Sequence, residues 1–520
     1  MTAAPASARL SPAPRPSLDD RTAFRLVLAV AVGLALFRLV VLAIGQMPLY
    51  LDEAQYWFWG KDPAFGYFSK PPLIGWAIAA TTAVCGDGPA CVKASSPLAY
   101  AVSPLFAYLL GRNLFSVRVG LFAGIGFATL PGVAFSGFIV STDPLLLTCW
   151  MGALWAFERG LVLGTRRYFI YTGLFLGLGM LAKYAMVYFF GPALIVMALG
   201  THGRRHWGGL ALAGVIGLIV LSPNLIWNAL SGFETFKHTA ANASVGAHVG
   251  NLAGVVDFLA DQVAIIGPIL ALVLVATLVR PRGLFKDPGI RLLAWFSLPI
   301  LGLLIAQAFL SRAHGNWAAV AYPALSLLLF AALAKLDYPR LLKATIGCHM
   351  AAFLVIGVAL AAGQVPFVKL STATDPFRWI RGWDKLAAAV EQNRQPPGER
   401  PRAVITTERG ATAELIYHLR DTEALVRRWS ADENAPDDHF AMVLELDDAL
   451  GCDAVIVSRG PALPPALVER FASVEGPTRI DMRPYEDRKG TYHLFIGRDF
   501  GRVAVPDNTC RSITRTGRRL

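Results

Sequence analysis

Two adjacent carboxylates and a lysine stand in a short stretch directly after the first long apolar segment of this chain. The stretch, YLDEAQYWFWGKDPAFGYFSKPPLIGW, contains Asp52, Glu53 and Lys70 among many aromatic rings. Such charges are costly beside a membrane unless they are hydrated or paired. Neighbours on a helix point about 100° apart, so we expect one acid to do chemistry and the other to brace it. These residue types are suited to a group-transfer reaction, because a carboxylate can take a proton and an ammonium group can stabilise a leaving phosphate.

Further polar residues stand at the ends of later apolar segments. Asp143 begins one such segment in STDPLLL, where a following proline also fits a purely structural helix N-cap. Lys183 and Tyr184 lie at a turn between two segments. Lys70 by itself could equally be an interfacial lysine that reaches towards water. The other candidates, in two later loops, are His238, Arg312, His314 and Asn316.

The elements that must position these residues are membrane spans. Of the 520 residues, 55% are hydrophobic and only 16% are charged, and the mean hydropathy is +0.48. Soluble domains carry about a quarter charged residues, so this composition predicts an α-helical polytopic membrane protein. Apolar runs near the roughly 20 residues that cross a bilayer predict about eleven spans. They lie near 23–44, 96–112, 118–140, 144–160, 168–182, 184–200, 208–228, 262–279, 292–310, 317–334 and 341–362.

Basic residues set the expected orientation. Arginines gather in the N-terminal tail and in one set of loops, and the positive-inside rule places that side in the cytoplasm. An odd number of spans then puts the candidate residues on the outer, periplasmic side of the inner membrane. Topology explains the net charge of +12, so no nucleic-acid partner is needed beside the membrane lipids. We expect residues 1–22 to be disordered, 23–362 to form the membrane domain, and 71–84 to form a re-entrant or interfacial helix.

From about residue 363 to residue 520 the composition is that of a soluble domain. RAVITT, DAVIVS, PTRIDM and TYHLFIG are typical of strands, and ATAELIYHLRD and PALVERFASV of helices, so a small α/β domain is expected. It contains no nucleotide-binding, metal-binding or hydrolase motif, so we expect it to cover a site formed elsewhere. Four cysteines fall on the outer side, where Cys85–Cys91 and Cys452–Cys510 are the expected bridges and unpaired thiols are the alternative.

Outer carboxylates combined with outer cations suit one kind of reaction. Transfer of a sugar from a polyprenyl-phosphate donor needs a base for the acceptor and fixed positive charge at the leaving phosphate. No nucleotide donor is available outside the cytoplasm, so a lipid must carry the activated sugar. Apolar grooves between helices would hold its tail.

An ordered set of motifs resembles the bacterial membrane glycosyltransferases of family 39 and the related lipid A aminoarabinose transferases. These belong to the protein O-mannosyltransferase superfamily. The matching pieces are LDEAQYW, KPPLIGW, GDGPACVK, STDPLLL, GLGMLAKYAM, HGNWAAVAYPAL and DPFRWIRGWDKLAAAV. The resemblance implies a GT-C fold with outer-loop juxtamembrane helices and an inverting transfer. It also implies an acceptor in lipid A, the lipopolysaccharide core or another envelope glycan.

Roles for individual residues follow from the residues and the resemblance together. The resemblance makes Asp52 the base or acceptor-orienting carboxylate, Glu53 its support, and Asp143 a second acid of the active site. We predict as catalytic Asp52, Glu53 and Asp143; as donor phosphate-binding Lys70, Lys183 and Arg312; and as substrate-binding Tyr56, Tyr67, Tyr184, His238, His314 and Asn316. No cofactor is expected, and a divalent metal held by the outer acids is the less favoured alternative.

Two positions depart from the family pattern. Lys93 stands where many relatives have arginine, which keeps the charge but loses bidentate contacts. His314 is followed by Gly315 and Asn316 instead of a charged neighbour. The alternatives are a transporter of a lipid-linked or anionic substrate, a protein O-glycosyltransferase, and an inactive glycan-binding protein. Transporters often have two repeated halves and place buried charges near the midplane of the membrane. In this sequence the two halves do not match, and the acids cluster at one face of the membrane.

Overall fold

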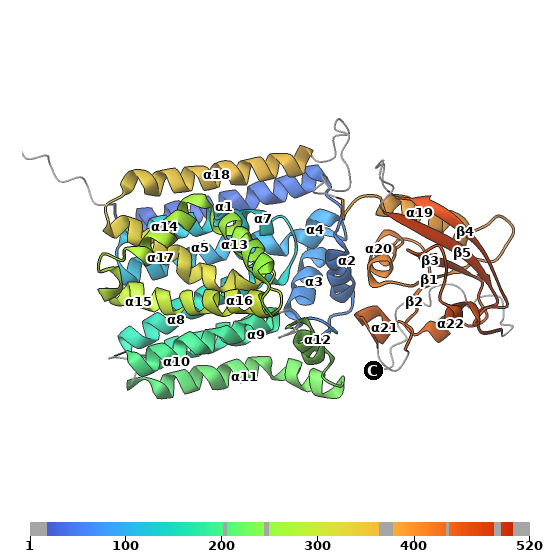
Figure 1. The fold of residues 1–520 in the computed structure, drawn as a ribbon, viewed down its shortest axis with the longest axis horizontal. Coiled ribbons are helices and arrows are strands. Elements are labelled where there is room, and N and C mark those ends of the chain that lie inside the picture. The colour runs from blue at the N-terminus through green and yellow to red at the C-terminus, as the bar shows by residue number, and fades with distance from the viewer. Residues whose placement is uncertain are drawn as a thin grey trace, which may run out of the picture.

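The structure, a computed structural model, describes residues 18–200, 205–243, 249–362, 378–432, 436–482 and 490–502. A long bundle of helices is joined at one end to a smaller domain built on a β-sheet (Figure 1). This architecture confirms the predicted class, a helical membrane protein with a C-terminal α/β domain. The helices of the bundle are α1 (Asp20–Gly45), α2 (Leu51–Lys61), α3 (Leu73–Cys85), α4 (Pro89–Lys93), α5 (Ser95–Leu114), α6 (Val117–Thr129), α7 (Pro131–Ser136), α8 (Thr142–Leu163), α9 (Arg166–Ala182), η1 (Tyr184–Phe189), α10 (Phe190–Leu199), α11 (Trp207–Leu230), α12 (Glu234–Ala243), α13 (Leu252–Ile266), α14 (Pro268–Val279), η3 (Leu284–Lys286), α15 (Pro288–Trp295), α16 (Leu298–Leu310), η4 (Gly315–Ala321), α17 (Tyr322–Lys335) and α18 (Pro339–Ala362).

Each predicted span coincides with one or two helices. Among the described residues, six helices are long and apolar enough to cross a membrane, or seven when one bent pair counts as a span. The predicted span 118–140 is divided between α6 and α7, because Pro131 cannot donate to the ladder of α6. The expected disorder of residues 1–22 is wrong at its end, since α1 begins at Asp20; residues 1–17 lie outside the described part of the chain. The number of eleven spans stays a prediction.

The predicted span 262–279 is wrong as a single straight helix. Helices α13 and α14 meet at Gly267 with a bend of 112°. Gly267 has a φ of +83°, which glycine adopts without strain, and Pro268 takes the first position of the next helix. As a result α13 packs against α16 and η4, at the end of the bundle that carries the outer loops.

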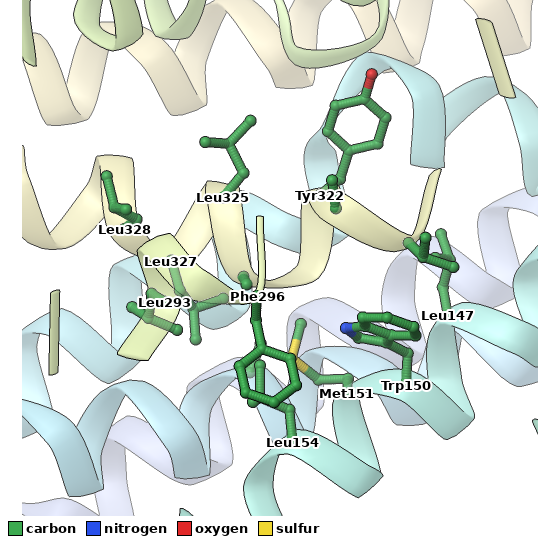
Figure 2. Close-up of a cluster of buried hydrophobic side chains, with 14 of the residues drawn as sticks. Leu147, Trp150, Met151, Leu154, Leu293, Phe296, Tyr322, Leu325, Leu327 and Leu328 are labelled. Carbon is green, nitrogen blue, oxygen red and sulfur yellow. The ribbon is translucent and has the colours of Figure 1, made fainter. Parts of the chain in front are cut away.

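The core of the bundle lies around α17. In the apolar window of Gly315–Lys335, 83% of the residues are buried, against 28% in α11 and 22% in α18. Figure 2 shows Trp150, Met151 and Leu154 of α8 beside Phe296, with the leucines of α17 above them. A helix that is apolar on all sides and buried is a central one, whereas α11 and α18 turn apolar faces outward, as lipid contact requires.

The described residues of the C-terminal domain include one mixed sheet of five strands. Its elements are α19 (Trp383–Arg394), β1 (Ala403–Thr406), α20 (Arg409–His418), β2 (Val426–Arg428), α21 (His439–Val443), η5 (Leu446–Ala449), β3 (Ala454–Ser458), α22 (Pro465–Val468), β4 (Ser473–Asp481), β5 (Thr491–Arg498) and η6 (Phe500–Arg502). The strand order is β2-β1-β3-β5-β4, with β2, β1 and β3 parallel and the other two antiparallel. The four predicted strands are confirmed. The predicted helix PALVERFASV is wrong beyond α22, because its last residues enter β4.

Helix α20 attaches the C-terminal domain to the bundle by packing against α2 (Figure 1). The Tyr417 hydroxyl of α20 donates to the backbone oxygen of Asp87 at 2.9 Å, and its ring meets Trp57 edge-on at 5.0 Å. Asp87 lies inside the loop closed by the Cys85–Cys91 disulfide, which confirms the first predicted bridge. The second predicted bridge involves Cys510, which lies outside the described residues.

A buried carboxyl group at this junction makes the stability of the folded protein depend on pH. Glu414 of α20 is fully buried, and neither of its carboxyl oxygens has a hydrogen-bond partner among the described residues. Burial raises the pKa of Glu414 well above its ordinary value of 4.5, and the charge of Glu53 adds to this effect. The folded protein therefore binds this proton more tightly than the unfolded chain, so stability is greatest below pH 4.5 and falls as the pH rises through the raised pKa.

We expect Glu414→Gln to remove this loss of stability. Thermal unfolding of the detergent-solubilised protein over a series of pH values measures it. The wild type should lose stability relative to the variant as the pH rises, because only the wild type must ionise a buried group. Glu475→Gln, at a residue whose side chain is 65% exposed, is the matched control and should follow the wild type. Parallel curves for Glu414→Gln and wild type would contradict the assignment.

Candidate active site

Glu53 fixes the helix that carries the first candidate acid. Its carboxylate accepts the backbone N–H of Tyr50 and that of Val140, each at 2.8 Å, and lies 2.7 Å from the Lys93 ammonium. Lys93 is fully buried and also donates to the backbone oxygen of Pro48. Both charges of the pair are thus satisfied inside the protein. Glu53 braces α2, which leaves Asp52, on the neighbouring helical face, as the exposed acid of the two.

Asp52 faces the C-terminal domain. Its Oδ1 lies 2.7 Å from Nη1 of Arg409, the first residue of α20, and both side chains are 39% exposed. The same nitrogen donates to the Gln55 side chain at 2.6 Å. An acid in the first turn of α2 is also favoured by the helix dipole. The candidate base is therefore accessible and held in place by a residue from the other domain.

Asp143 is the centre of a second cluster. Its Oδ1 lies 2.7 Å from the Lys183 ammonium, and its Oδ2 accepts from the Asn316 amide at 3.2 Å. The N-cap of α8 is Ser141, whose hydroxyl accepts from the Asp143 N–H at 3.4 Å. The structural alternative, Asp143 as the N-cap, is therefore wrong. Three outer loops meet at this carboxylate.

The backbone of the loop around Lys70 is fixed, whereas the Lys70 ammonium group has no counter-ion among the described residues. The loop is tied to α11 and α12 because the Asn224 amide donates to Phe65 O and the Thr235 hydroxyl donates to Tyr67 O, both at 2.7 Å. Gly66 lies so close to the Trp227 ring that an added Cβ would sit 2.2 Å from it. In the described part of the chain, the Lys70 ammonium has neither an ion pair nor a hydrogen bond. A partly buried cation without a counter-ion is suited to an anionic ligand.

Electrostatic effects show that these charges form one site. Burial lowers the pKa of the Lys70 ammonium; Lys183 lowers it further, while Asp52 and Asp143 act in the opposite direction. Burial also raises the pKa of Tyr56 well above its ordinary value, with Asp52 and Asp143 among the charges that act on it. Charges that act on one another's pKa lie close together, because Coulombic energy falls with distance. Asp52, Tyr56, Lys70, Asp143 and Lys183 therefore surround a common space.

The other predicted residues lie at different depths around this space. The pKa of His238 is lowered by burial and then by Lys70, which places its ring near the site. Tyr184 donates to the Asn224 side chain at 2.7 Å, and Tyr67, 1% exposed, stacks on Trp59 at 4.4 Å. Arg312 and His314 are exposed between α16 and η4, and Asn316 is the member of that loop that reaches Asp143.

A cavity of about 890 Å³ lies next to the cluster, between the C-terminal domain and the outer ends of α2 and α11. Phe58, Trp59, Tyr67, Trp227 and His439 contribute aromatic walls to it. The acids Asp52 and Asp143 do not line this cavity. We define the candidate site by the charged cluster, because that is where a base and an unpaired cation occur together.

No group of three or more His, Cys, Asp or Glu side chains within the described ranges could hold a metal ion. Asp52 and Asp143 are each paired with a cation, which removes the negative charge that a divalent ion requires. Transfer without a metal stays a prediction.

Comparisons with known proteins show what the chain is similar to. A family model described as dolichyl-phosphate-mannose-protein mannosyltransferase matches residues 69–227. A lipid A galacturonosyltransferase of Rhizobium johnstonii is 29% identical over 404 residues, which are 76% of this chain and 82% of that protein. An undecaprenyl phosphate aminoarabinose arabinosyl transferase of Pseudomonas aeruginosa is 33% identical over 167 residues, 30% of each chain.

A solved structure extends the likeness to the whole fold. The crystal structure of ArnT from Cupriavidus metallidurans in the apo state has a TM-score of 0.65 at 15% identity, over 93% of this chain and 99% of that one. The same protein bound to undecaprenyl phosphate gives a TM-score of 0.63. The chain is similar to the glycosyltransferases of family 39 and has their GT-C fold. The predicted resemblance, fold and reaction class of this multi-pass membrane glycosyltransferase are thus confirmed, whereas the roles of its individual site residues stay predictions.

Sequence reasoning missed two residues of the glycosyltransferase site, Arg409 and Gln55. Arg409 follows strand β1 at the start of α20, in ITTERG. The carboxyl ends of parallel strands are where α/β domains bind ligands, so this position was a possible signal. Its partner Asp52 stands 357 positions earlier, and no local pattern relates the two.

The Glu53–Lys93 pair provides a stability test of the glycosyltransferase. We expect Lys93→Ala to destabilise the protein by about 3–5 kcal/mol, because it leaves a buried carboxylate without its cation. Thermal unfolding in detergent measures the loss. The double variant Glu53→Gln/Lys93→Met removes both charges and should recover much of it. Equal stability of Lys93→Ala and wild type would show that the pair is not needed.

Proposed function

We propose that this protein transfers a single sugar, with inversion, from a polyprenyl-phosphate donor to an acceptor in lipid A, the lipopolysaccharide core or another envelope glycan. The observation that carries the proposal is the unpaired Lys70 ammonium beside the accessible Asp52 carboxylate. One group is suited to the donor phosphate and the other to the acceptor hydroxyl. The names of the relatives support both substrates: one modifies lipid A, and another uses undecaprenyl phosphate.

The proposed transfer is a single displacement at the anomeric carbon of the donor sugar. Asp52 takes the proton of the acceptor hydroxyl as its oxygen attacks the anomeric carbon of the sugar. The bond between that carbon and the phosphate oxygen breaks, and its electron pair leaves with the polyprenyl phosphate. Lys70 stabilises the second negative charge that the phosphate gains. Attack opposite the leaving group inverts the anomeric centre, and no metal takes part in the proposed step.

Asp143 has a supporting role in this proposal. Its carboxylate is bound by Lys183 on one side and Asn316 on the other, and its side chain is only 12% exposed. It therefore positions Lys183 and the loop before η4 instead of taking a proton. Lys183 also lies near enough to Lys70 to add positive charge at the phosphate.

We further propose that the site lies on the periplasmic side of the bacterial inner membrane. The Cys85–Cys91 disulfide occurs at the same end of the bundle as the charged cluster, and disulfides persist in oxidising compartments. The basic loops between other helices lie towards the cytoplasm by the positive-inside rule. A protein acceptor is less favoured, because the matched relative of greatest coverage described above acts on lipid A.

We expect Asp52→Asn to lower transfer by about 100- to 10,000-fold, because the amide cannot accept the proton. Purified wild type and variant receive extracted envelope lipids as donor and acceptor, with and without EDTA, and the products are read by mass spectrometry. A glycan mass shift that EDTA leaves unchanged and the variant loses is the expected result. Full transfer by the variant would move the base to another acid. No transfer by either protein would count against the function.

Lys70→Ala should raise the donor KM by about 10- to 100-fold, because a charge-assisted contact to phosphate contributes about 1.5–3 kcal/mol. Initial rates over a series of donor concentrations measure it. Lys237→Ala is the matched control, since that lysine is 65% exposed on α12 and pairs with a neighbouring glutamate. An unchanged donor KM in Lys70→Ala would remove Lys70 from the phosphate site.

A further inference from the structure

The C-terminal domain delivers one charged side chain directly to the candidate active site. Arg409 contacts Asp52 and Gln55 through a single nitrogen, Nη1, at 2.7 and 2.6 Å. Its Nε and Nη2 make no hydrogen bond within the described ranges of the chain. A guanidinium group carries five donors in a planar fork, so most of this fork is still available.

Domain attachment alone does not explain a positive charge at this position. A cation in the first turn of a helix meets the positive end of the helix dipole, which is unfavourable for α20. The preceding acid, Glu408, is engaged by Tyr492 and Arg459 instead. A neutral donor suffices for attachment elsewhere on the same helix, where the Tyr417 hydroxyl bonds Asp87. The charge of Arg409 therefore indicates a ligand of opposite charge.

The ion pair also restrains the candidate base. While Arg409 holds Asp52, its guanidinium group occupies Oδ1 of the carboxylate, which is then less open to an acceptor hydroxyl. Both members of the pair act on the pKa of Lys70, the lysine assigned to the donor phosphate, so they lie where the donor must bind. Arg409 acts on the pKa of His238 as well, across the same space. An anion that took over Arg409 would release Asp52.

We propose that Arg409 binds an oxyanion of the donor, either a carboxylate on its sugar or an oxygen of its phosphate, and thereby frees Asp52 to receive the acceptor proton. The inference rests on the proposed function and adds a donor-binding residue from the second domain. A sugar that carries a positive charge is excluded from this position by repulsion. The base is then fully available only when a donor is bound, which couples the two substrates.

The test uses two donors that differ in one group. Undecaprenyl phosphate carries galacturonic acid in one and galactose in the other, so only the first has a sugar carboxylate. For wild type and Arg409→Gln we measure donor affinity by direct titration, and donor KM and kcat by initial rates. Arg409→Gln should weaken donor binding by about 10- to 100-fold, the effect of losing a charge-assisted contact. Arg409→Lys, which keeps the charge but not the fork, should fall in between.

The two donors distinguish the two sources of the oxyanion. A loss confined to the galacturonosyl donor assigns Arg409 to the sugar carboxylate, and an equal loss for both assigns it to the phosphate; either supports the proposal. Tyr417→Phe is the matched control, because it removes a neutral contact of the same helix with the same loop. Unchanged donor affinity in Arg409→Gln, or an equal loss in Tyr417→Phe, would overturn the proposal. Arginine-dependent donor binding without any transfer would instead contradict the proposed function alone.

Discussion

The carboxylate of Glu53 joins three segments that are remote in the sequence. It accepts from the chain before α2 and from the chain before α8, and it pairs with the buried Lys93 of α4. A charge at the edge of an apolar medium is tolerated only when its partners are complete, so these segments have little freedom to separate. Because α2 is fixed in this way, the next residue on it, Asp52, is directed away from the bundle and towards the second domain. The position of the candidate base thus depends on the buried acid next to it.

The remaining charges of the site follow a graded pattern of pairing. The Lys93–Glu53 pair is fully enclosed, the Lys183–Asp143 pair is mostly enclosed, and the Arg409–Asp52 pair is about four-tenths exposed. Lys70 has no counter-ion in the described part of the protein. This order runs from structural to chemical use, since an exchangeable ion pair needs access and an enclosed one resists exchange. Substrates can therefore reorganise the outermost pair without disturbing the bundle.

The sequence was most informative where function depends on short motifs. Asp52, Lys70, Asp143 and Lys183 stand next to spans whose apolar length is evident, so the sequence could place them at one end of the bundle, where the structure brings them together. The different surroundings of Asp52 and Glu53 followed from helical geometry, because adjacent residues on a helix point in different directions.

Other features depend on contacts that no local pattern contains. The bend at Gly267 is a property of two residues within an otherwise continuous apolar run. Ser141, and not Asp143, is the N-cap of α8, and the Asp143 carboxylate contacts Lys183 and Asn316 instead. Arg409 was missed because the first α-helix after β1 meets α2 only when both domains are in place. Strand β2 contains three residues, too few to show alternation, and its place at the sheet edge comes from pairing with β1.

The loop closed by Cys85 and Cys91 has a consequence for how the molecule is made. Within it, the side chain of Asp87 receives the Trp57 indole N–H at 2.8 Å and pairs with Lys61, while its backbone oxygen receives Tyr417 from the other domain. A disulfide reduces the number of conformations of a loop before the contacts of the loop form. The loop surface that α20 contacts is therefore ordered in advance only where thiols become oxidised. A chain inserted with this end in a reducing compartment would lack that prepared surface. The disulfide therefore ties completion of the two-domain site to a compartment in which this loop can be oxidised.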